Sequence, residues 1–225
     1  MIRIAINGFG RIGRNLFRLL INHPTIEVVA INDIADTKTM AHLMKYDSIH
    51  GVLPFQVSHD EKGIIIDGKH FLFFHEKNIS NLDWKSNRID CVIESTGKYS
   101  TFEEINAHIV AGAKKVILSA PSEVDSIKTV VIGVNENILD GTETIISNAS
   151  CTTNCLAPMI KVLNDNYGID KGYMSTVHAY TADQNLQDAP QSDLRRARAA
   201  AYSIIPTTTG AAEAVTKVIP EMEGK

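Results

Sequence analysis

The sequence has no long hydrophobic run: no apolar stretch approaches the ~20 residues that a helix needs to cross a bilayer. Its first residues, 1–4, lack the charged-then-apolar plan of a signal peptide, so we expect a cytosolic protein that does not engage a membrane. Three cysteines without an export signal do not make a disulfide framework. A formal net charge of -4 argues against a protein whose main task is binding nucleic acid. What remains, 44% hydrophobic and 21% charged residues, is the makeup of a folded globular protein.

Strands and helices alternate along the first part of the chain. Phe17, Leu20 and Ile21 share one face of a helix after Gly13, and a second helical pattern precedes Gly112. Strand-like runs cover 2–7, 27–32, 89–94, 115–119, 129–134 and 143–146. This alternation predicts an α/β fold with a doubly wound parallel sheet.

Two regions depart from that alternation. Residues 54–75 carry short apolar segments around two turn signals and predict an antiparallel hairpin inserted into the sheet. We place a domain boundary near Ser150, which separates 1–150 from 151–225. Beyond it we expect an incomplete α+β domain: a helix to about Asn164, a long strand over 169–179, a polar loop over 181–203, a short strand, and a helix over 210–218.

A glycine-rich turn follows the first strand and opens a helix. Gly8 would make the turn, Gly10 would let a pyrophosphate approach the backbone, and Gly13 would permit close helix–strand packing. Asp33, 20 residues beyond Gly13, is placed to accept hydrogen bonds from an adenosine ribose and to repel a 2′-phosphate. The pattern therefore predicts NAD as cofactor, whereas a glycine turn beside a solvated aspartate is the alternative. Thr96 and Ser119 follow later strands, at the carboxyl ends where ligands of open sheets bind.

Cys151 lies where a strand gives way to a helix, the position at which a cysteine becomes a nucleophile. Unpaired backbone N–H groups and the helix dipole favour the thiolate there. His178 could reach it through space and activate it, although each residue alone could equally be a packed core side chain. We expect Cys155 to be a packed helix residue and Cys91 a buried one, and no metal site, because no second cysteine pair has zinc-like spacing.

Hydroxyl and arginine side chains follow the cysteine and suit an anionic ligand. Thr181 comes shortly after His178, and a threonine run ending at Gly210 opens another helix. Arg195, Arg196 and Arg198 lie in the loop between them, and we expect one of the three to bind phosphate. A solvated face or a subunit contact is the alternative for these arginines.

Segments spread over the whole chain resemble phosphorylating glyceraldehyde-3-phosphate dehydrogenase of the bacterial type. They are 7–13, 30–33, 94–97, 147–158, 176–180, 193–201 and 204–212, of which Ser-Asn-Ala-Ser-Cys-Thr-Thr-Asn-Cys at 147–155 is highly specific. Erythrose-4-phosphate dehydrogenase shares the cysteine motif, but the Thr181 position looks like the glycolytic enzyme. The resemblance implies a NAD-binding domain of the Rossmann type over 1–150 and the amino-terminal part of a catalytic domain over 151–225.

The resemblance also implies a mechanism and a set of site residues. Cys151 would attack glyceraldehyde 3-phosphate with His178 as base, and inorganic phosphate would release the resulting thioester as an acyl phosphate. Ser150, Thr152, Thr181, Arg196, Thr209 and Gly210 would serve the substrate and phosphate sites, and Gly8, Gly10, Arg11, Ile12, Gly13, Asp33, Lys77, Thr96 and Ser119 would hold NAD. It implies a homotetramer for the full-length enzyme.

Members of this family continue further toward the carboxyl terminus, so the resemblance implies that the carboxyl-terminal third is missing here. A catalytically incomplete NAD-binding fragment is therefore the alternative to an active enzyme. We expect the isolated chain to aggregate or to stay partly unfolded beyond Ser150.

Overall fold

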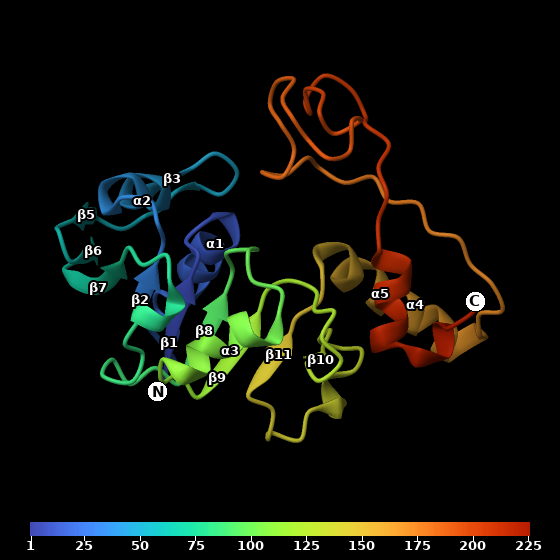
Figure 1. Cartoon of the computed structure of the whole chain (residues 1–225), viewed down its shortest axis with the longest axis horizontal. Coiled ribbons are helices and arrows are strands. Elements are labelled where there is room, and N and C mark those ends of the chain that lie inside the picture. The colour runs from blue at the N-terminus through green and yellow to red at the C-terminus, as the bar shows by residue number, and fades with distance from the viewer. The chain divides into compact units, whose positions relative to one another are not determined.

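A computed structural model describes residues 1–225 and divides them into two compact units, Met1–Ser150 and Cys151–Lys225. The first unit is built on a nine-stranded sheet with the order β10-β11-β9-β8-β1-β2-β7-β6-β5 (Figure 1). Its strands are β1 (Ile2–Asn7), β2 (Ile26–Asn32), β5 (Val57–His59), β6 (Gly63–Ile66), β7 (Lys69–Phe74), β8 (Cys91–Glu94), β9 (Lys115–Leu118), β10 (Lys128–Thr129) and β11 (Ile145–Ser147). Its helices are α1 (Arg11–Leu20), α2 (Thr37–Lys45) and α3 (Phe102–Val110), with short 3₁₀ turns at Ile79–Asn81 and Glu136–Ile138 and a small hairpin of β3 (Tyr46–Asp47) and β4 (Gly51–Val52).

The pairing of the strands confirms the predicted α/β class. Every neighbouring pair from β10 to β7 is parallel, whereas β6 pairs antiparallel with both β7 and β5. The insertion expected over 54–75 is thus an antiparallel meander, and its last strand joins the parallel sheet beside β2. The strand order reverses at β1, which has β2 on one side and β8 on the other. A ligand of such a sheet binds outside the carboxyl ends of the strands at this reversal.

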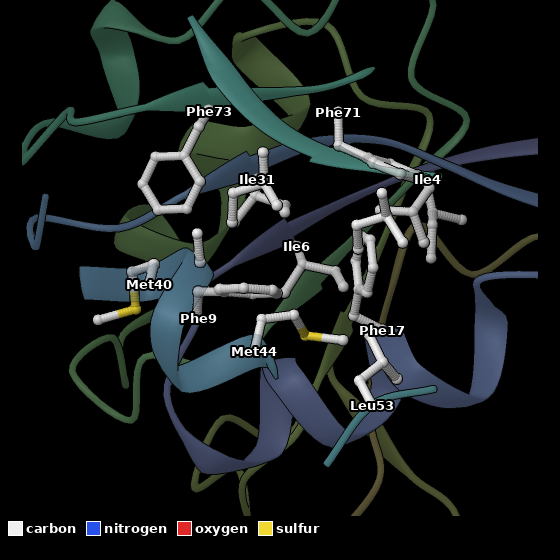
Figure 2. Close-up of a cluster of buried hydrophobic side chains, with 14 residues drawn as sticks. Ile4, Ile6, Phe9, Phe17, Ile31, Met40, Met44, Leu53, Phe71 and Phe73 are labelled. Atoms are coloured by element: carbon white, nitrogen blue, oxygen red, sulfur yellow. The ribbon is translucent and has the colours of Figure 1, made fainter. Parts of the chain in front are cut away.

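Hydrophobic clusters cover both faces of the sheet because side chains alternate along each strand. On β1, Ile4 and Ile6 belong to one cluster and Ala5 to the other. The first cluster contains several aromatic rings that pack edge-on (Figure 2). The ring of Phe17, on α1, is edge-on to Phe9 at 5.7 Å and to Phe71 at 4.8 Å between ring centroids. The second cluster centres on Trp84, which is fully buried. The two clusters therefore bury β1 from both faces of the sheet.

The first unit departs from the expectations in one strand and in one additional helix. The strand expected over 129–134 ends at Thr129, because the Asn135 side chain donates to the Thr129 carbonyl and accepts from the Val131 N–H group, at 2.9 Å each. These contacts take backbone groups that a longer strand would need. Helix α2 was not expected, and it begins where the Asp36 carboxylate accepts from the Thr39 N–H group at 2.8 Å.

The second unit consists of α4 (Cys151–Tyr167), α5 (Ala211–Val218) and a 3₁₀ turn at Pro220–Met222, joined by a long irregular segment. Ala157 of α4 and Val215 of α5 are buried in this unit. The strand expected over 169–179 and the short one after Ser203 do not form. A strand needs a ladder partner, and no segment of Cys151–Lys225 provides one, so Tyr173 and Val177 remain exposed. None of the helices of the chain combines the length and hydrophobicity that crossing a bilayer requires.

Candidate dinucleotide site and nucleophile

A cavity of about 260 Å³ opens at the carboxyl ends of β1, β2 and β8, where the strand order reverses. Five of the expected cofactor residues line it: Gly8, Gly10, Asp33, Lys77 and Thr96. Residues that the sequence reasoning did not single out as cofactor-binding complete the wall, namely Asn7, Asn32, Ile34, Glu76, Ser95, Lys98 and Tyr99. Asn7 and Asn32 each end an apolar strand, and a polar residue at that position in the sequence could have identified them. Both are buried in the structure.

The glycines of the turn after β1 differ in what surrounds them. Gly8 has a φ of +90°, and a Cβ atom there would lie 2.6 Å from the backbone nitrogen of Thr96. A Cβ atom at Gly13 would lie 2.2 Å from the Gly8 carbonyl oxygen, so helix α1 packs closely against the turn. A Cβ atom at Gly10, by contrast, would meet nothing within 4 Å. Open space beside the first residue of a helix leaves room for a pyrophosphate to reach the helix N-terminus.

Asp33 lies at the end of β2 and ties the glycine turn to the cavity. Its Oδ2 atom accepts from the Phe9 N–H group at 2.7 Å and its Oδ1 atom from the Ala35 N–H group at 3.0 Å. A carboxylate has about four acceptor positions, so capacity remains for ribose hydroxyl groups. The chemistry of the donor set therefore fits a dinucleotide with an unphosphorylated ribose.

The other expected cofactor residues do not line the cavity. Arg11, the first residue of α1, pairs with Asp47 at 3.1 Å, and Ile12 is exposed. The Ser119 N–H group donates to the Glu94 carbonyl at 2.9 Å, which holds the end of β9 beside β8. Arg11 and Ile12 remain cofactor candidates by the resemblance alone, and Ser119 by the resemblance and by its position directly after β9.

In the second unit, Cys151 is the first residue of α4, and Ser150 directly precedes it. Its Sγ atom lies 3.3 Å from the Nε2 atom of His178. The Nδ1 atom of His178 lies 2.6 Å from the Ala179 carbonyl oxygen and donates its hydrogen there, which leaves Nε2 to face the thiol. Thiol and imidazole thus come together from 27 residues apart, although the strand expected to carry His178 is absent.

The surroundings of the pair favour a charged thiolate and imidazolium. Burial raises the pKa of the Cys151 thiol, but hydrogen bonds from His178 and Thr152 outweigh it and set the pKa below its ordinary value. The hydrogen bond to the Ala179 carbonyl, followed by the interaction with Cys151, raises the pKa of His178. Both shifts move the proton from sulfur to nitrogen, as an activated nucleophile requires.

The other two cysteines differ from Cys151. Burial raises the pKa of Cys91, which lies in β8, to about 11. Cys155 is exposed on α4, so the expectation that it is a packed helix residue was wrong. Cys155 lies one helical turn after Cys151, and both cysteines are exposed on α4.

Ser150 and Thr152 flank Cys151, whereas the other four expected phosphate residues are dispersed over the irregular segment and the start of α5. Thr181 has a local partner, because its N–H group donates to the Gln184 Oε1 atom at 2.9 Å. Arg196 pairs with Asp183, and Thr209 accepts from the Ala211 N–H group at the start of α5, whose N-cap is Gly210. None of these four residues makes a hydrogen bond or ion pair with Cys151 or His178. The other two arginines also pair locally, Arg195 with Asp193 and Arg198 with Asp188.

Comparison with known proteins matches both units to one family. A family model described as glyceraldehyde 3-phosphate dehydrogenase, NAD binding domain, covers residues 2–102, and one described as the C-terminal domain of the same enzyme covers residues 150–225. Glyceraldehyde-3-phosphate dehydrogenase of Geobacillus stearothermophilus is 53% identical over 225 residues, which are 100% of this chain and 67% of the relative. That of Mycoplasma pneumoniae is 57% identical over 214 residues, 95% of this chain and 64% of the relative, and that of Clostridium pasteurianum is 54% identical over 227 residues, 100% and 68%.

The chain therefore spans about two thirds of the length of these curated relatives. The match extends through the glycine turn with Asp33 and through the Cys151 segment. With a NAD-binding domain followed by the start of the C-terminal domain, the chain belongs to the glyceraldehyde-3-phosphate dehydrogenase family.

Proposed function

We propose that this protein carries out the NAD-dependent oxidation and phosphorylation of glyceraldehyde 3-phosphate to 1,3-bisphosphoglycerate, a reaction of glycolysis and gluconeogenesis. The observation that carries the proposal is the 3.3 Å contact between Cys151 Sγ and His178 Nε2. It occurs in a chain whose first unit provides a dinucleotide cavity. A nucleophilic thiol and a hydride acceptor together suit the oxidation of an aldehyde.

The first step belongs to Cys151 and His178. The thiol proton passes to His178 Nε2, and the thiolate attacks the aldehyde carbon to form a C–S bond. The imidazolium then returns this proton to the carbonyl oxygen, which gives a neutral thiohemiacetal and leaves Nε2 free. NAD, when bound, accepts the hydride that leaves the same carbon. His178 takes the hydroxyl proton as the C=O bond forms again, so the products of this half-reaction are a thioester on Cys151, NADH and one proton.

The cofactor is held by the first unit. Asp33 would accept the ribose hydroxyl groups, and the turn from Gly8 to Gly13 would receive the pyrophosphate at the N-terminus of α1. The other groups proposed for NAD are Arg11, Ile12, Lys77, Thr96 and Ser119.

Phosphate completes the second half-reaction. An oxygen of inorganic phosphate attacks the thioester carbon, the C–S bond breaks, and the thiolate of Cys151 is restored. Arg196 and the hydroxyl groups of Thr181 and Thr209 are proposed to bind the phosphate groups of the substrate and of this nucleophile, together with Ser150, Thr152 and Gly210. For Arg196 this requires that a phosphate replace or share its present partner Asp183.

The setting proposed for this activity follows the family. We assign the protein to the cytoplasm and to a homotetrameric enzyme, with glyceraldehyde 3-phosphate and inorganic phosphate as its small-molecule partners, and without nucleic acid or membrane as partners.

The thioester on Cys151 gives the test. The chain is mixed with glyceraldehyde 3-phosphate and NAD without phosphate, quenched in acid, digested and analysed by mass spectrometry. An acyl group on the Cys151 peptide that disappears on addition of phosphate supports the proposal. Acylation by erythrose 4-phosphate alone would assign a different substrate, and no acylation of a NAD-bound sample would contradict the proposal.

A further inference from the structure

A buried polar network lies beside the dinucleotide cavity, and its central carboxylate is not among the groups proposed above to bind NAD or substrate. Its centre is Glu94, the last residue of β8, with an exposed fraction of 1%. His108 on α3 and Trp84 are fully buried, and both belong to the same network. A buried carboxylate is costly unless donors surround it, so the direction of each hydrogen bond matters.

Trp84 sets the direction at one end. Its indole N–H group can only donate, and it donates to the Nδ1 atom of His108 at 3.0 Å. Nδ1 is therefore the acceptor of that ring, and the hydrogen of the neutral imidazole is on Nε2. Nε2 lies 3.0 Å from the Oε2 atom of Glu94 and donates to it.

At the other end of the network, the backbone N–H group of Glu76 fixes the direction of the hydrogen bonds through Asn32 and Asn7. This group donates to Asn32 Oδ1 at 2.8 Å, so the Asn32 amide nitrogen is the donor, to Asn7 Oδ1 at 2.7 Å. The amide nitrogen of Asn7 then donates to the Oε2 atom of Glu94 at 2.5 Å. Both ends of the network therefore converge on one carboxylate oxygen as acceptor.

The second oxygen of Glu94 accepts from Thr96. The Thr96 N–H group lies 2.8 Å and the Thr96 hydroxyl 2.5 Å from Oε1, and the hydroxyl in turn accepts from the Lys98 N–H group at 3.1 Å. Four donors thus face two oxygens, and the ionised carboxylate is the form that satisfies all of them. None of these partners carries a positive charge.

Of the three residues that donate to the Glu94 carboxylate, Asn7 and Thr96 line the dinucleotide cavity. They come from β1 and from the loop after β8, on either side of the strand reversal. The same loop meets the glycine turn, because the Ser95 hydroxyl donates to the Gly8 carbonyl at 2.7 Å. A shift of Glu94 would therefore move both walls of the cavity and the turn expected to receive pyrophosphate.

We propose that Glu94, fixed by neutral His108 and Trp84, is a positioning residue for NAD: it sets the distance between Asn7 and Thr96 that the cofactor requires. The inference rests on NAD binding by the first unit and not on the aldehyde chemistry of Cys151. Loss of turnover with NAD binding retained would therefore contradict the proposed function and leave this inference intact.

Glu94→Gln is the direct test, with Glu103→Gln as its control. Glutamine keeps the shape but offers one acceptor oxygen and brings donors of its own, so two of the four donors lose their acceptor. We expect calorimetric titration with NAD to show an affinity at least about 10-fold lower. Glu103 is an exposed carboxylate on α3, and the same change there leaves the affinity unchanged.

Trp84 is the only tryptophan of the chain and provides a spectroscopic readout. We expect NAD to change its emission and the NMR resonance of its indole N–H group in the unmodified protein and in Glu103→Gln, and not in Glu94→Gln. If Glu94 only stabilised the fold, the Trp84 signals of the folded Glu94→Gln variant would still respond to NAD.

His108 gives a second pair of variants that does not alter the carboxylate. His108→Gln can place an amide N–H group where Nε2–H lies, whereas His108→Leu cannot, and the two side chains are of similar size. We expect the glutamine variant to bind NAD within about 3-fold of the unmodified protein and the leucine variant about 10-fold more weakly. Unchanged NAD affinity in folded Glu94→Gln and His108→Leu, whatever their melting temperatures, would overturn the inference.

Discussion

His178 directs its Nε2 atom at the sulfur of Cys151, 3.3 Å away, while its Nδ1 atom donates to a backbone carbonyl. The backbone therefore selects which nitrogen faces the thiol. Both side chains are exposed, Cys151 as the first residue of α4 and His178 in the irregular segment beyond it, so a small aldehyde has access to them. This geometry leads to the first three predictions.

The thiolate of Cys151 should persist to lower pH than that of an ordinary cysteine. Thiolate is the form that iodoacetamide alkylates, and hydrogen bonds from His178 and Thr152 outweigh the effect of burial and lower the pKa of Cys151 below its ordinary value of 9.0. In a Cys155→Ser background, the rate of alkylation should rise with pH to a midpoint below 9.0 and shift upward in His178→Asn. Cys91 does not interfere near neutral pH, because its pKa is raised to about 11. A midpoint that His178→Asn leaves in place would contradict the pairing.

Cys151→Ser should abolish NADH formation and leave NAD affinity unchanged. A hydroxyl group at this position is a far poorer nucleophile than a thiolate, while the dinucleotide cavity lies in the first unit. Steady-state kinetics and calorimetry on the same sample check both halves. The matched control is Cys155→Ser, the same change one helical turn away, which retains turnover. Turnover in Cys151→Ser would mean that another residue is the nucleophile.

His178→Asn should lower the rate of NADH formation by ~10²- to 10⁴-fold through the loss of base catalysis. Asparagine can keep the hydrogen bond to the Ala179 carbonyl, so the local backbone is preserved while the proton acceptor is lost. Single-turnover kinetics of acylation separate this effect from product release. An unchanged acylation rate would remove His178 from the mechanism.

The two glycines at the turn should respond in opposite ways to alanine. Gly8→Ala places a Cβ atom 2.6 Å from the Thr96 backbone nitrogen at a φ of +90°, so we expect a loss of stability above ~1 kcal/mol, measured by thermal unfolding. Gly10→Ala meets no atom within 4 Å and should leave the melting temperature nearly unchanged. Its methyl group fills the space expected for pyrophosphate, so NAD affinity should fall. Normal NAD affinity in Gly10→Ala would place the cofactor elsewhere.

Asp33→Asn should relax the choice of cofactor. The amide keeps an acceptor oxygen for the Phe9 N–H group but removes the negative charge that repels a 2′-phosphate. We expect the ratio of the NADP and NAD dissociation constants to fall by at least about 10-fold, mainly through tighter NADP binding. Glu76→Gln, a carboxylate that also lines the cavity, is the control and should leave the ratio in place. If the ratio stays constant in Asp33→Asn, Asp33 does not contact the ribose.

Local sequence signals predicted most strands of the first unit and both helices of the second, but the strands expected in the second unit do not form. Strand β1 occupies 2–7 as expected, because an alternating apolar run ends there at a glycine turn. Helix α2 was missed although Met40, Ala41 and Met44 are buried on it and Asp36 is a favourable N-cap. The strand expected over 169–179 failed for a physical reason: its residues have the composition of a strand, but strand formation depends on a partner that composition does not reveal.

The site shows the same division. The glycine turn with Asp33 and the cysteine at a helix start are local patterns, and a reader of the sequence can place them without the fold. The network of Asn7, Glu94 and His108 joins residues that lie 14 to 101 positions apart, and only the parallel sheet brings them together. Glutamate in a strand and histidine in a helix carry no signal of their own, so the contacts of Glu94 and His108 behind the cavity wall could not be predicted.

NADH formation by the 225-residue chain tests the central claim most directly. The chain is incubated with glyceraldehyde 3-phosphate and NAD, with phosphate or arsenate present and then omitted, and absorbance of NADH is followed over many turnovers. The account predicts sustained NADH formation that requires the anion and disappears in Cys151→Ser. A folded sample that binds NAD but forms no NADH with the anion present, or that forms it equally well without the anion, would contradict phosphorylating dehydrogenase activity.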